Sequence, residues 1–192
     1  YPAPANLLEG RNILVTGAGD GIGRSAALAY AAHGATVWLL GRTEAKLEAV
    51  YDEIEAAGGA QPAILPVDLA TLNEQQCHTL ATTLADNMPH LEGLLHNASV
   101  LGERRPIEST RYESWSEVMQ VNVNAQFLLT RALLPLLDAA PAASIIFTSS
   151  GVGRQGRAYW GAYAVSKFAT EGLMQVLADE LENTSQVRVN SL

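Results

Sequence analysis

The sequence predicts a single-domain α/β fold in which a doubly wound parallel sheet carries helices on both faces. Short apolar runs, rich in leucine or β-branched residues, alternate along the 192 residues with longer segments of helical period. Such alternation is typical of a parallel sheet covered by helices. Runs such as Ile13–Val15 and Ile145–Phe147 are continuously apolar, which indicates strands that are buried on both faces. The length suits one hydrophobic core and is too short for two ordinary domains.

Six of the short runs are the predicted strands, and five segments between them are the predicted helices. The strands are Asn12–Thr16, Thr36–Leu40, Ala63–Val67, Gly93–Leu95, Ser144–Thr148 and Val187–Asn190, and the helices are Gly21–Ala32, Glu44–Ala57, Glu74–Asn87, Tyr112–Leu137 and Tyr159–Asn183. Pro66 cannot donate a ladder hydrogen bond, so the third strand is expected at an edge of the sheet. The strand order 3-2-1-4-5-6 of doubly wound sheets puts the third strand there.

The composition argues against several classes of protein. The formal net charge of −8 disfavours a nucleic-acid-binding surface, which is usually basic. The single cysteine, Cys77, and four scattered histidines provide neither a disulfide framework nor a zinc motif. No apolar run approaches the roughly 18 residues of a membrane-spanning helix, and residues 1–9 lack the pattern of a signal peptide. We therefore expect a cytoplasmic protein whose residues 1–10 form a short N-terminal arm on the surface.

A glycine-rich loop follows the first predicted strand and opens the first predicted helix. Glycines let the backbone turn tightly and approach a pyrophosphate, and the helix N-terminus offers free N–H groups to phosphate oxygens. A turn without a ligand is the alternative, but the position between a strand and a helix favours dinucleotide binding. The loop reads Thr-Gly-Ala-Gly-Asp-Gly-Ile-Gly over residues 16–23, and its candidate cofactor-binding residues are Gly17, Asp20, Gly21, Ile22 and Gly23.

The spacing T-G-x-x-x-G-x-G, with the motifs that follow it, resembles the short-chain dehydrogenase/reductase family and within it the bacterial 3-oxoacyl reductases. The resemblance extends over nearly the whole chain, from residue 12 to residue 190. It implies a Rossmann NAD(P)-binding domain over residues 11–192. It also implies that Asp68 and Leu69 contact the adenine and that Asn97 and Ala98 line the nicotinamide side.

The end of the second predicted strand favours NADP(H) over NAD(H). NAD-binding units usually carry Asp or Glu there, which bonds the adenosine ribose hydroxyls. Here that position is Gly41, and Arg42 follows it. Arg42 would pair with the 2′-phosphate of NADP(H) in bidentate fashion, although it could also lie in solvent at the start of the next helix. Asp20 is a mild contrary sign, because many NADP-preferring relatives carry a basic residue in that part of the loop.

Tyr163 and Lys167 stand four residues apart and therefore lie on one face of a predicted helix. Tyrosine has a reference pKa of about 10, and a neighbouring ammonium stabilises its phenolate. Such a phenol can protonate a carbonyl oxygen as hydride arrives, or accept the proton in the reverse reaction. The family resemblance implies that Tyr163 and Lys167 also contact the cofactor, Lys167 by bonding the nicotinamide ribose. It further implies that Ser150, thirteen residues before Tyr163, bonds the substrate oxygen. Ser149 and Tyr159 are the nearest rivals.

The resemblance also assigns a role to one residue of the predicted helix 112–137. Asn122 matches the family's catalytic-set asparagine, whose main chain holds a water that connects Lys167 to solvent, and Asn124 is the plainer alternative. Two positions depart from the family pattern, because His96 stands where asparagine is usual and Ser99 where glycine is usual. We expect His96 to be a packed structural residue and not a ligand or a base.

Together these residues predict an NADP(H)-dependent oxidoreductase that reduces a carbonyl or oxidises the corresponding alcohol. The alternative is a catalytically idle NADP(H)-binding sensor or scaffold, which would not need the Ser-Tyr-Lys set. The four-residue spacing from Tyr to Lys disfavours an enoyl reductase, and the glycine spacing disfavours an epimerase or dehydratase. By the resemblance, a substrate-covering loop and a seventh strand are expected beyond residue 192.

Two further expectations concern partners. Arginines in the loops after the fourth and fifth strands would attract a small substrate that is anionic, or one bound as a thioester to an acidic carrier, unless they are solvated or paired with Glu103 and Glu108. These arginines are Arg104, Arg105, Arg154 and Arg157. Apolar side chains on helices 112–137 and 159–183 exceed what one side of a sheet requires. Since relatives pair these helices, a homodimer or homotetramer is expected.

Overall fold

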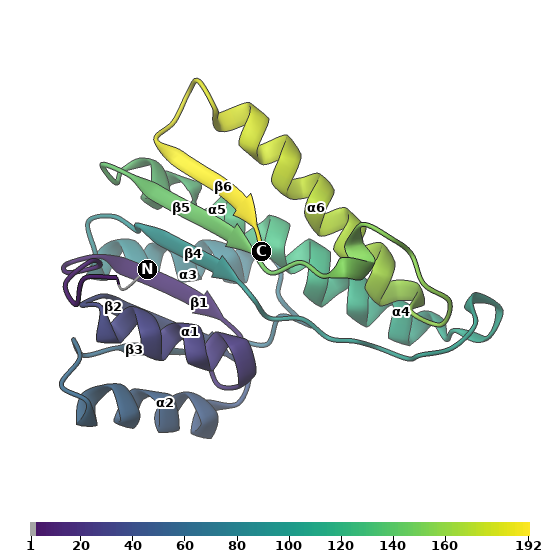
Figure 1. Ribbon diagram of the computed structural model, residues 1–192, viewed down its shortest axis with the longest axis horizontal. Helices are drawn as coiled ribbons and strands as arrows, with labels where there is room; N and C mark the ends of the chain where they lie inside the picture. Colours follow the sequence, from purple (N-terminus) through teal and green to yellow (C-terminus); the bar gives the residue numbers. More distant parts are fainter. Residues whose placement is uncertain (1–2) are drawn as a thin grey trace.

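A six-stranded parallel sheet forms the centre of the molecule (Figure 1). The structure is a computed structural model, and it describes residues 3–192. The strands are β1 (Asn12–Thr16), β2 (Thr36–Gly41), β3 (Ala63–Pro66), β4 (Gly93–His96), β5 (Ala143–Phe147) and β6 (Val187–Ser191). Their order is β3-β2-β1-β4-β5-β6, and every neighbouring pair is parallel. The predicted fold class is confirmed, and β3 lies at the edge with Pro66 as its last residue.

The helices cover the two faces of this sheet, with α1 and α2 in front and α3 and α5 behind it in Figure 1. They are α1 (Gly21–Ala32), α2 (Glu44–Ala56), α3 (Glu74–Asn87), α4 (Tyr112–Met119), α5 (Ala125–Asp138) and α6 (Gly161–Leu181). Short 3-10 turns, η1 (Ile107–Ser109) and η3 (Gly151–Gly153), lie in the loops before α4 and α6. Across residues 3–192, the helices lack the combination of length and apolar composition that crossing a bilayer requires.

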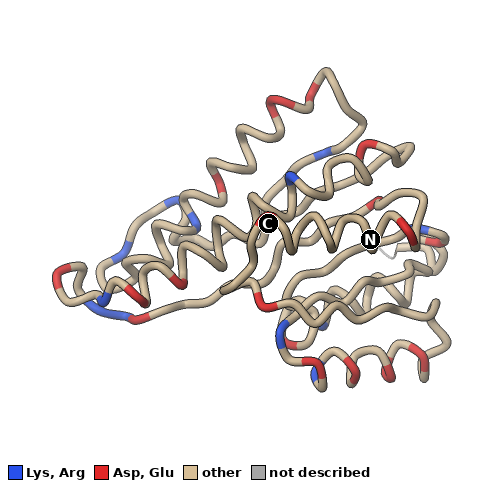
Figure 2. The backbone as a smooth tube through the Cα atoms, turned by 180° about the vertical axis from the view of Figure 1, so that it is seen from behind, with Lys and Arg blue, Asp and Glu red and all other residues tan. Residues whose placement is uncertain are grey.

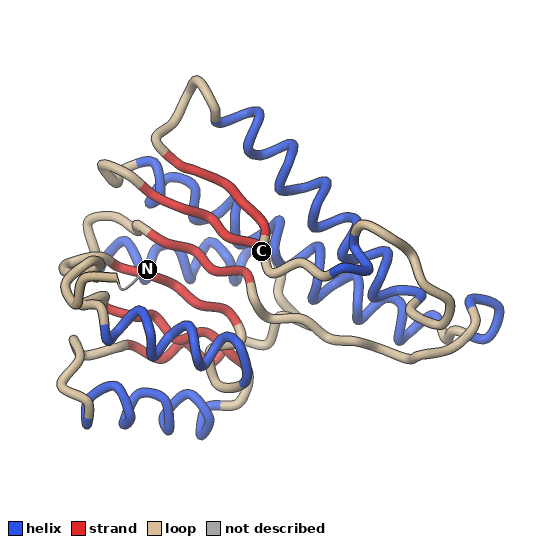
Figure 3. The backbone as a smooth tube through the Cα atoms, viewed as in Figure 1, coloured by secondary structure: helices blue, strands red, loops and turns tan. Residues whose placement is uncertain are grey.

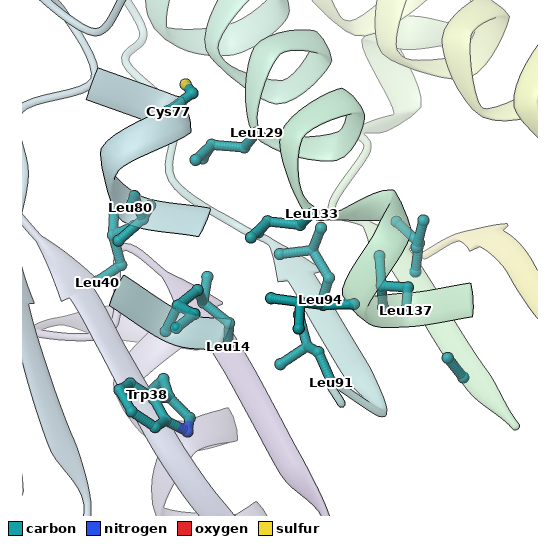
Figure 4. Close-up of a cluster of buried hydrophobic side chains, with 14 of the residues drawn as sticks. Leu14, Trp38, Leu40, Cys77, Leu80, Leu91, Leu94, Leu129, Leu133 and Leu137 are labelled. Atoms are coloured by element: carbon teal, nitrogen blue, oxygen red, sulfur yellow. The ribbon is translucent and has the colours of Figure 1, made fainter. Parts of the chain in front are cut away.

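Two apolar cores, one on each face, hold the layers together. Alternate residues of β1 point to opposite cores, with Leu14 on one side and Val15 on the other. The larger core packs the sheet against α3, α5 and α6, and Figure 4 shows Leu133 of α5 beside Leu94 of β4 there. The smaller core packs it against α1 and α2. Because both faces of β1, β2 and β4 are buried, the continuous apolar runs of the sequence follow directly.

Two of the predicted helices differ from the observed ones. The predicted helix 112–137 is divided into α4 and α5 by a π-helical turn, η2 (Gln120–Asn124), although Figure 3 shows one continuous helical rod. The predicted helix 159–183 begins at Gly161, because Tyr159 has a φ of 71°, a left-handed conformation that a right-handed helix cannot include. The other boundaries differ by one or two residues, as is usual at element ends.

The described part of the N-terminal arm lies against the end of α1. The Leu8 amide donates to the His33 carbonyl (2.8 Å), and the His33 ring lies 2.8 Å from the Pro4 carbonyl oxygen. Gly34 has a φ of 96°, and a Cβ there would come within 2.9 Å of the Glu9 Cα. The arm therefore packs at the edge of the sheet opposite to the one where the predicted site residues gather.

Candidate active site

The predicted cofactor residues gather at the carboxyl edge of the sheet, where the ends of β1, β2, β3 and β4 surround a cavity of about 470 Å³. A cavity of this size is typical of small-molecule sites, and the position matches the crevice of open α/β sheets. Eight of the twelve predicted cofactor residues line it: Gly17, Asp20, Gly21, Arg42, Asp68, Leu69, Asn97 and Ala98. Ile22, Gly23, Tyr163 and Lys167 do not line the cavity.

The glycine loop has a geometry that side chains would prevent. Gly17 has a φ of 67°, and a Cβ there would lie 3.0 Å from the Ala98 backbone. A Cβ on Gly23 would lie 2.2 Å from the Gly17 carbonyl oxygen, which explains a glycine that does not face the cavity. Asp20 caps α1, because its carboxylate accepts a bond from the Gly21 amide (2.8 Å). Beside this cap, the glycine backbone at the start of α1 fits a bound pyrophosphate.

The side of the cavity beyond β2 contains one residue that the sequence analysis missed. Gly41 has little room for a side chain, since a Cβ would lie 3.2 Å from Leu47, and Arg42 lines the cavity as predicted. Lys46 of α2 also lines it, and its Nζ donates to the second carboxylate oxygen of Asp20 (2.6 Å). This bond, followed by that of the Gly21 amide, lowers the pKa of Asp20. No sequence pattern indicated Lys46, because Arg42 precedes α2 and Asp20 is 26 residues away.

Thr16 holds the end of β4 beside the glycine loop. Its hydroxyl accepts bonds from the amides of Asn97 and Ala98 (both 3.0 Å), and the Asn97 side chain donates to the Thr16 carbonyl (3.1 Å). The residue before them, His96, is 1% exposed and contacts the Thr130 hydroxyl at 2.8 Å. Its ring stacks on Phe147 with centroids 4.8 Å apart. The structure thus places His96 as the packed residue that we predicted.

Lys167 and Tyr163 lie at the end of β5, next along the same edge. The Lys167 ammonium is 5.5 Å from the centre of the Tyr163 ring and donates to the Thr148 carbonyl (2.7 Å). Lys167 is 1% exposed, and its burial lowers its pKa to about 8. Ser150 begins η3, where its hydroxyl oxygen accepts a bond from the Val152 amide (3.4 Å). The hydroxyl hydrogen therefore remains available to an acceptor.

The π-helical turn η2 contributes a side chain that bonds both to the loop after β4 and to α6. Asn122, at its centre, is fully buried and forms two bonds with the Val100 main chain, at 2.8 and 2.9 Å. Its amide also donates to the Ser166 hydroxyl (3.0 Å), next to Lys167 in α6. The main-chain carbonyl of Asn122 accepts a long hydrogen bond from the Thr170 hydroxyl (3.4 Å). Asn122 thus joins three segments around the site, whereas Asn124 is exposed.

The predicted arginine rim lies on two long loops that extend beyond the sheet, where Figure 2 shows basic positions gathered at one end of the molecule. Several of these charges have partners. Arg105 lies 3.9 Å from Glu103, which Arg111 also contacts at 2.7 Å, and Arg154 lies 3.7 Å from Glu171. Two side chains differ from these: Arg104 stacks over the Trp160 ring at 4.6 Å, and Arg157 has no ion pair among residues 3–192.

Comparison with known proteins identifies the family. A family model described as short chain dehydrogenase matches residues 11–192. The chain is 55% identical to the uncharacterized oxidoreductase YciK of Escherichia coli (strain K12), over all of this chain and 75% of that protein. A solved structure from Pseudomonas syringae is 60% identical, with a TM-score of 0.97 over 100% of this chain and 79% of its own. Another, from Escherichia coli CFT073 and complexed with NADPH, is 56% identical, with a TM-score of 0.95 over 98% and 78%. The chain belongs to the short-chain dehydrogenase family and is an oxidoreductase of that family.

Proposed function

We propose that this protein is an NADP(H)-dependent oxidoreductase that interconverts a carbonyl compound and the corresponding alcohol. Three features support NADP(H) as the cofactor. The glycine loop fits a pyrophosphate, the end of β2 has Gly41 and Arg42 in place of a carboxylate, and a 56% identical structure is complexed with NADPH. When bound, NADP(H) supplies or accepts the hydride.

The observation that favours catalysis over a sensor or scaffold is the burial of Lys167. Among residues 3–192, no carboxylate lies within ion-pair distance of its ammonium, and it is 1% exposed. A buried and unpaired charge destabilises the fold, and titratable groups with strongly shifted pKa values cluster at functional sites. The pKa of Lys167 is lowered to about 8, so the ammonium remains largely protonated at neutral pH beside the Tyr163 ring. A protein that only bound the cofactor could use Lys167 at the ribose but would not need the Tyr163 phenol beside its ammonium.

The side chains at the end of β5 have complementary roles in the proposed reaction. The Tyr163 phenol donates its proton to the carbonyl oxygen of the substrate, and the Lys167 ammonium stabilises the phenolate that remains. Ser150 donates its hydroxyl hydrogen to the same substrate oxygen, since its own oxygen already accepts the Val152 amide. The Asn122 side chain bonds to both α6 and the loop after β4 and so fixes their positions around these groups.

The test is a pair of tyrosine variants. Tyr163→Phe should lower kcat by ~10² or more while NADPH still binds, because positioned general acids contribute on that scale. Tyr159→Phe is the matched control, four residues earlier and 59% exposed, and should retain kcat. The rate is followed by NADPH absorbance over a panel of carbonyl compounds, and NADPH binding by fluorescence. Near-normal kcat in Tyr163→Phe would place the proton donor elsewhere.

For the substrate we propose a carbonyl compound with an anionic group, presented free or as a carrier-bound thioester. Trp160 lies beside Tyr163, with ring centroids 5.9 Å apart, and the Arg104 guanidinium lies over the Trp160 ring, 4.6 Å from its centre. This gives an apolar wall near the reacting end and a cation beyond it. Arg104→Ala with Arg157→Ala should lower kcat/KM for a charged substrate at low salt but not for its neutral analogue. Arg188→Ala, on an exposed position of β6, is the control, and equal losses for both substrates would contradict the proposal.

A further inference from the structure

Two residues that line the cavity form an ion pair, and one of them is a lysine outside the predicted site. Asp20 of the glycine loop and Lys46 of α2 both line the cavity, and their charged groups are 2.6 Å apart. Both side chains are largely exposed, at 76% and 55%. An exposed ion pair of this kind contributes little to stability, so stability alone does not account for it.

The position of Lys46 is unfavourable for the helix that carries it. Lys46 lies in the first turn of α2, where the helix dipole favours anions and disfavours cations. It is also the only basic residue in α2, whose other charged residues are five acids. Lys46 thus lies at the end of α2 that meets the cavity, although the helix dipole disfavours a cation there. Such a placement is expected where the cation binds an anion.

The packing around Lys46 brings its stem against the glycine loop. A Cβ on Gly19 would lie 2.9 Å from the Lys46 Cβ, so the absence of a side chain at position 19 permits the approach. Gly41 in the same way leaves room for Leu47, the next residue of α2. The two glycines therefore allow the first turn of α2 to pack closely against the glycine loop and the end of β2. Arg42 and Lys46 both line the cavity there.

We propose that Lys46 is a specificity-determining residue that exchanges its bond to Asp20 for a bond to the 2′-phosphate of NADP(H). This inference rests on the proposed cofactor. Asp20 would hold the ammonium at the cavity until the phosphate, with its larger negative charge, replaces the carboxylate as its partner. NAD(H) lacks the phosphate and leaves the ion pair intact. The Asp20 carboxylate, an unexpected neighbour for a phosphate, is thereby neutralised in the free protein and acts as a competitor that only a phosphate displaces.

Chemical labelling tests this exchange directly, because Lys46 and Lys167 are the only lysines in the 192 residues and Lys167 is buried. Acetylation of Lys46 by an N-hydroxysuccinimide ester is quantified by peptide mass spectrometry in the free protein, with saturating NADP⁺ and with saturating NAD⁺. NADP⁺ should slow the acetylation of Lys46 several-fold beyond NAD⁺, which differs only in lacking the phosphate. Equal rates with the two cofactors would overturn the inference.

Binding measurements on four variants give an independent readout. Lys46→Met should weaken NADP⁺ about tenfold, the scale of a charged hydrogen bond, and leave NAD⁺ unchanged, whereas Lys46→Arg retains most of the affinity. Asp20→Asn keeps an N-cap for α1 and should tighten NADP⁺ binding, but not in the double variant with Lys46→Met. An Asp20→Asn effect that is independent of Lys46 contradicts the exchange. If the wild-type protein binds neither cofactor, the proposed function itself fails; if it binds NADP⁺ without protecting Lys46, only this inference does.

Discussion

His96 makes the stability of the protein sensitive to acid. It stacks on Phe147, contacts Thr130 and is almost completely buried, and this burial lowers its pKa to about 3. In the unfolded chain the imidazole has an ordinary pKa of about 6.5. Below that pH the unfolded state binds a proton that the native state does not bind. The stabilisation by a neutral His96 is therefore complete above pH 6.5 and is lost as the pH falls towards 3.

A comparison with His96→Asn isolates this effect, because contributions from the other titrating groups cancel in the difference. Between pH 7.5 and 5, the free energy of unfolding of the wild-type protein should fall by about 2 kcal/mol more than that of the variant. Urea unfolding curves at four pH values provide the measurement. Parallel pH profiles for the two proteins would show that His96 can be protonated without unfolding, whatever the absolute stability of the variant.

At the scale of single residues, the sequence could identify positions but not their contacts. Asn97 and Arg42 could be assigned from motif and strand end, and both line the cavity. Lys46 could not, because its partner Asp20 is 26 residues away and only the packing of α2 on the loop brings them together. The same limit applies to Asn122, whose bonds to Val100 and Ser166 span 22 and 44 residues.

At the scale of elements, periodicity predicted which segments are helices but not how their backbone deviates. The π-helical turn at 120–124 leaves the apolar pattern of the rod intact, so the pattern gives no sign of it, although such turns often mark functional sites. The left-handed conformation of Tyr159 is likewise invisible, because tyrosine has no preference for it. Gly17 and Gly21, with φ of 67° and 53°, were predictable, since glycine adopts such conformations at no steric cost.

Two Gly→Ala changes in different elements should have opposite effects. At Gly23, the first buried residue of α1, a methyl group would lie 2.2 Å from the Gly17 carbonyl oxygen, so Gly23→Ala should lower the free energy of unfolding by about 2 kcal/mol or more. At Gly172 in α6, no atom lies within 4 Å of the added carbon, and Gly172→Ala should stabilise the protein by about 0.5–1 kcal/mol. Thermal unfolding of both variants provides the measurement. Similar shifts in one direction would contradict the loop packing described above.

At the scale of the whole molecule, the strand order was predictable because few arrangements are compatible with alternating strands and helices. The apolar runs required strands buried on both faces, and Pro66 required an edge. The rim loops were less predictable. From the sequence, the rim arginines could be free, solvated or paired with Glu103 and Glu108. The fold brings Arg105 and Arg111 to Glu103, in agreement with the last of these possibilities, but it brings Arg154 to Glu171 in the middle of α6. The electrostatic character of a loop thus depends on contacts that form only after the chain has folded.

Exposed apolar side chains on α5 and α6 predict that the protein associates through these helices. The two lie side by side, joined by a bond from Thr170 to Gln126 (3.2 Å). Close in sequence to these two residues, Phe127 of α5 and Phe168 of α6 are each 46% exposed. Val165 and Val176 of α6 are 42% and 57% exposed. A cluster of large apolar side chains on one face marks an interaction surface, and for paired copies of one chain a two-fold dimer is the commonest arrangement.

Light scattering at micromolar concentration should therefore give at least twice the monomer mass, and Phe168→Glu should reduce it to the monomer by burying an unpaired charge at the contact. Leu7→Glu is the matched control, since Leu7 is similarly exposed at 50% but lies on the N-terminal arm, and it should leave the mass unchanged. A monomeric wild-type protein would show that the exposed residues of α5 and α6 do not associate. A Phe168→Glu variant that remained associated would show that the copies meet through another surface.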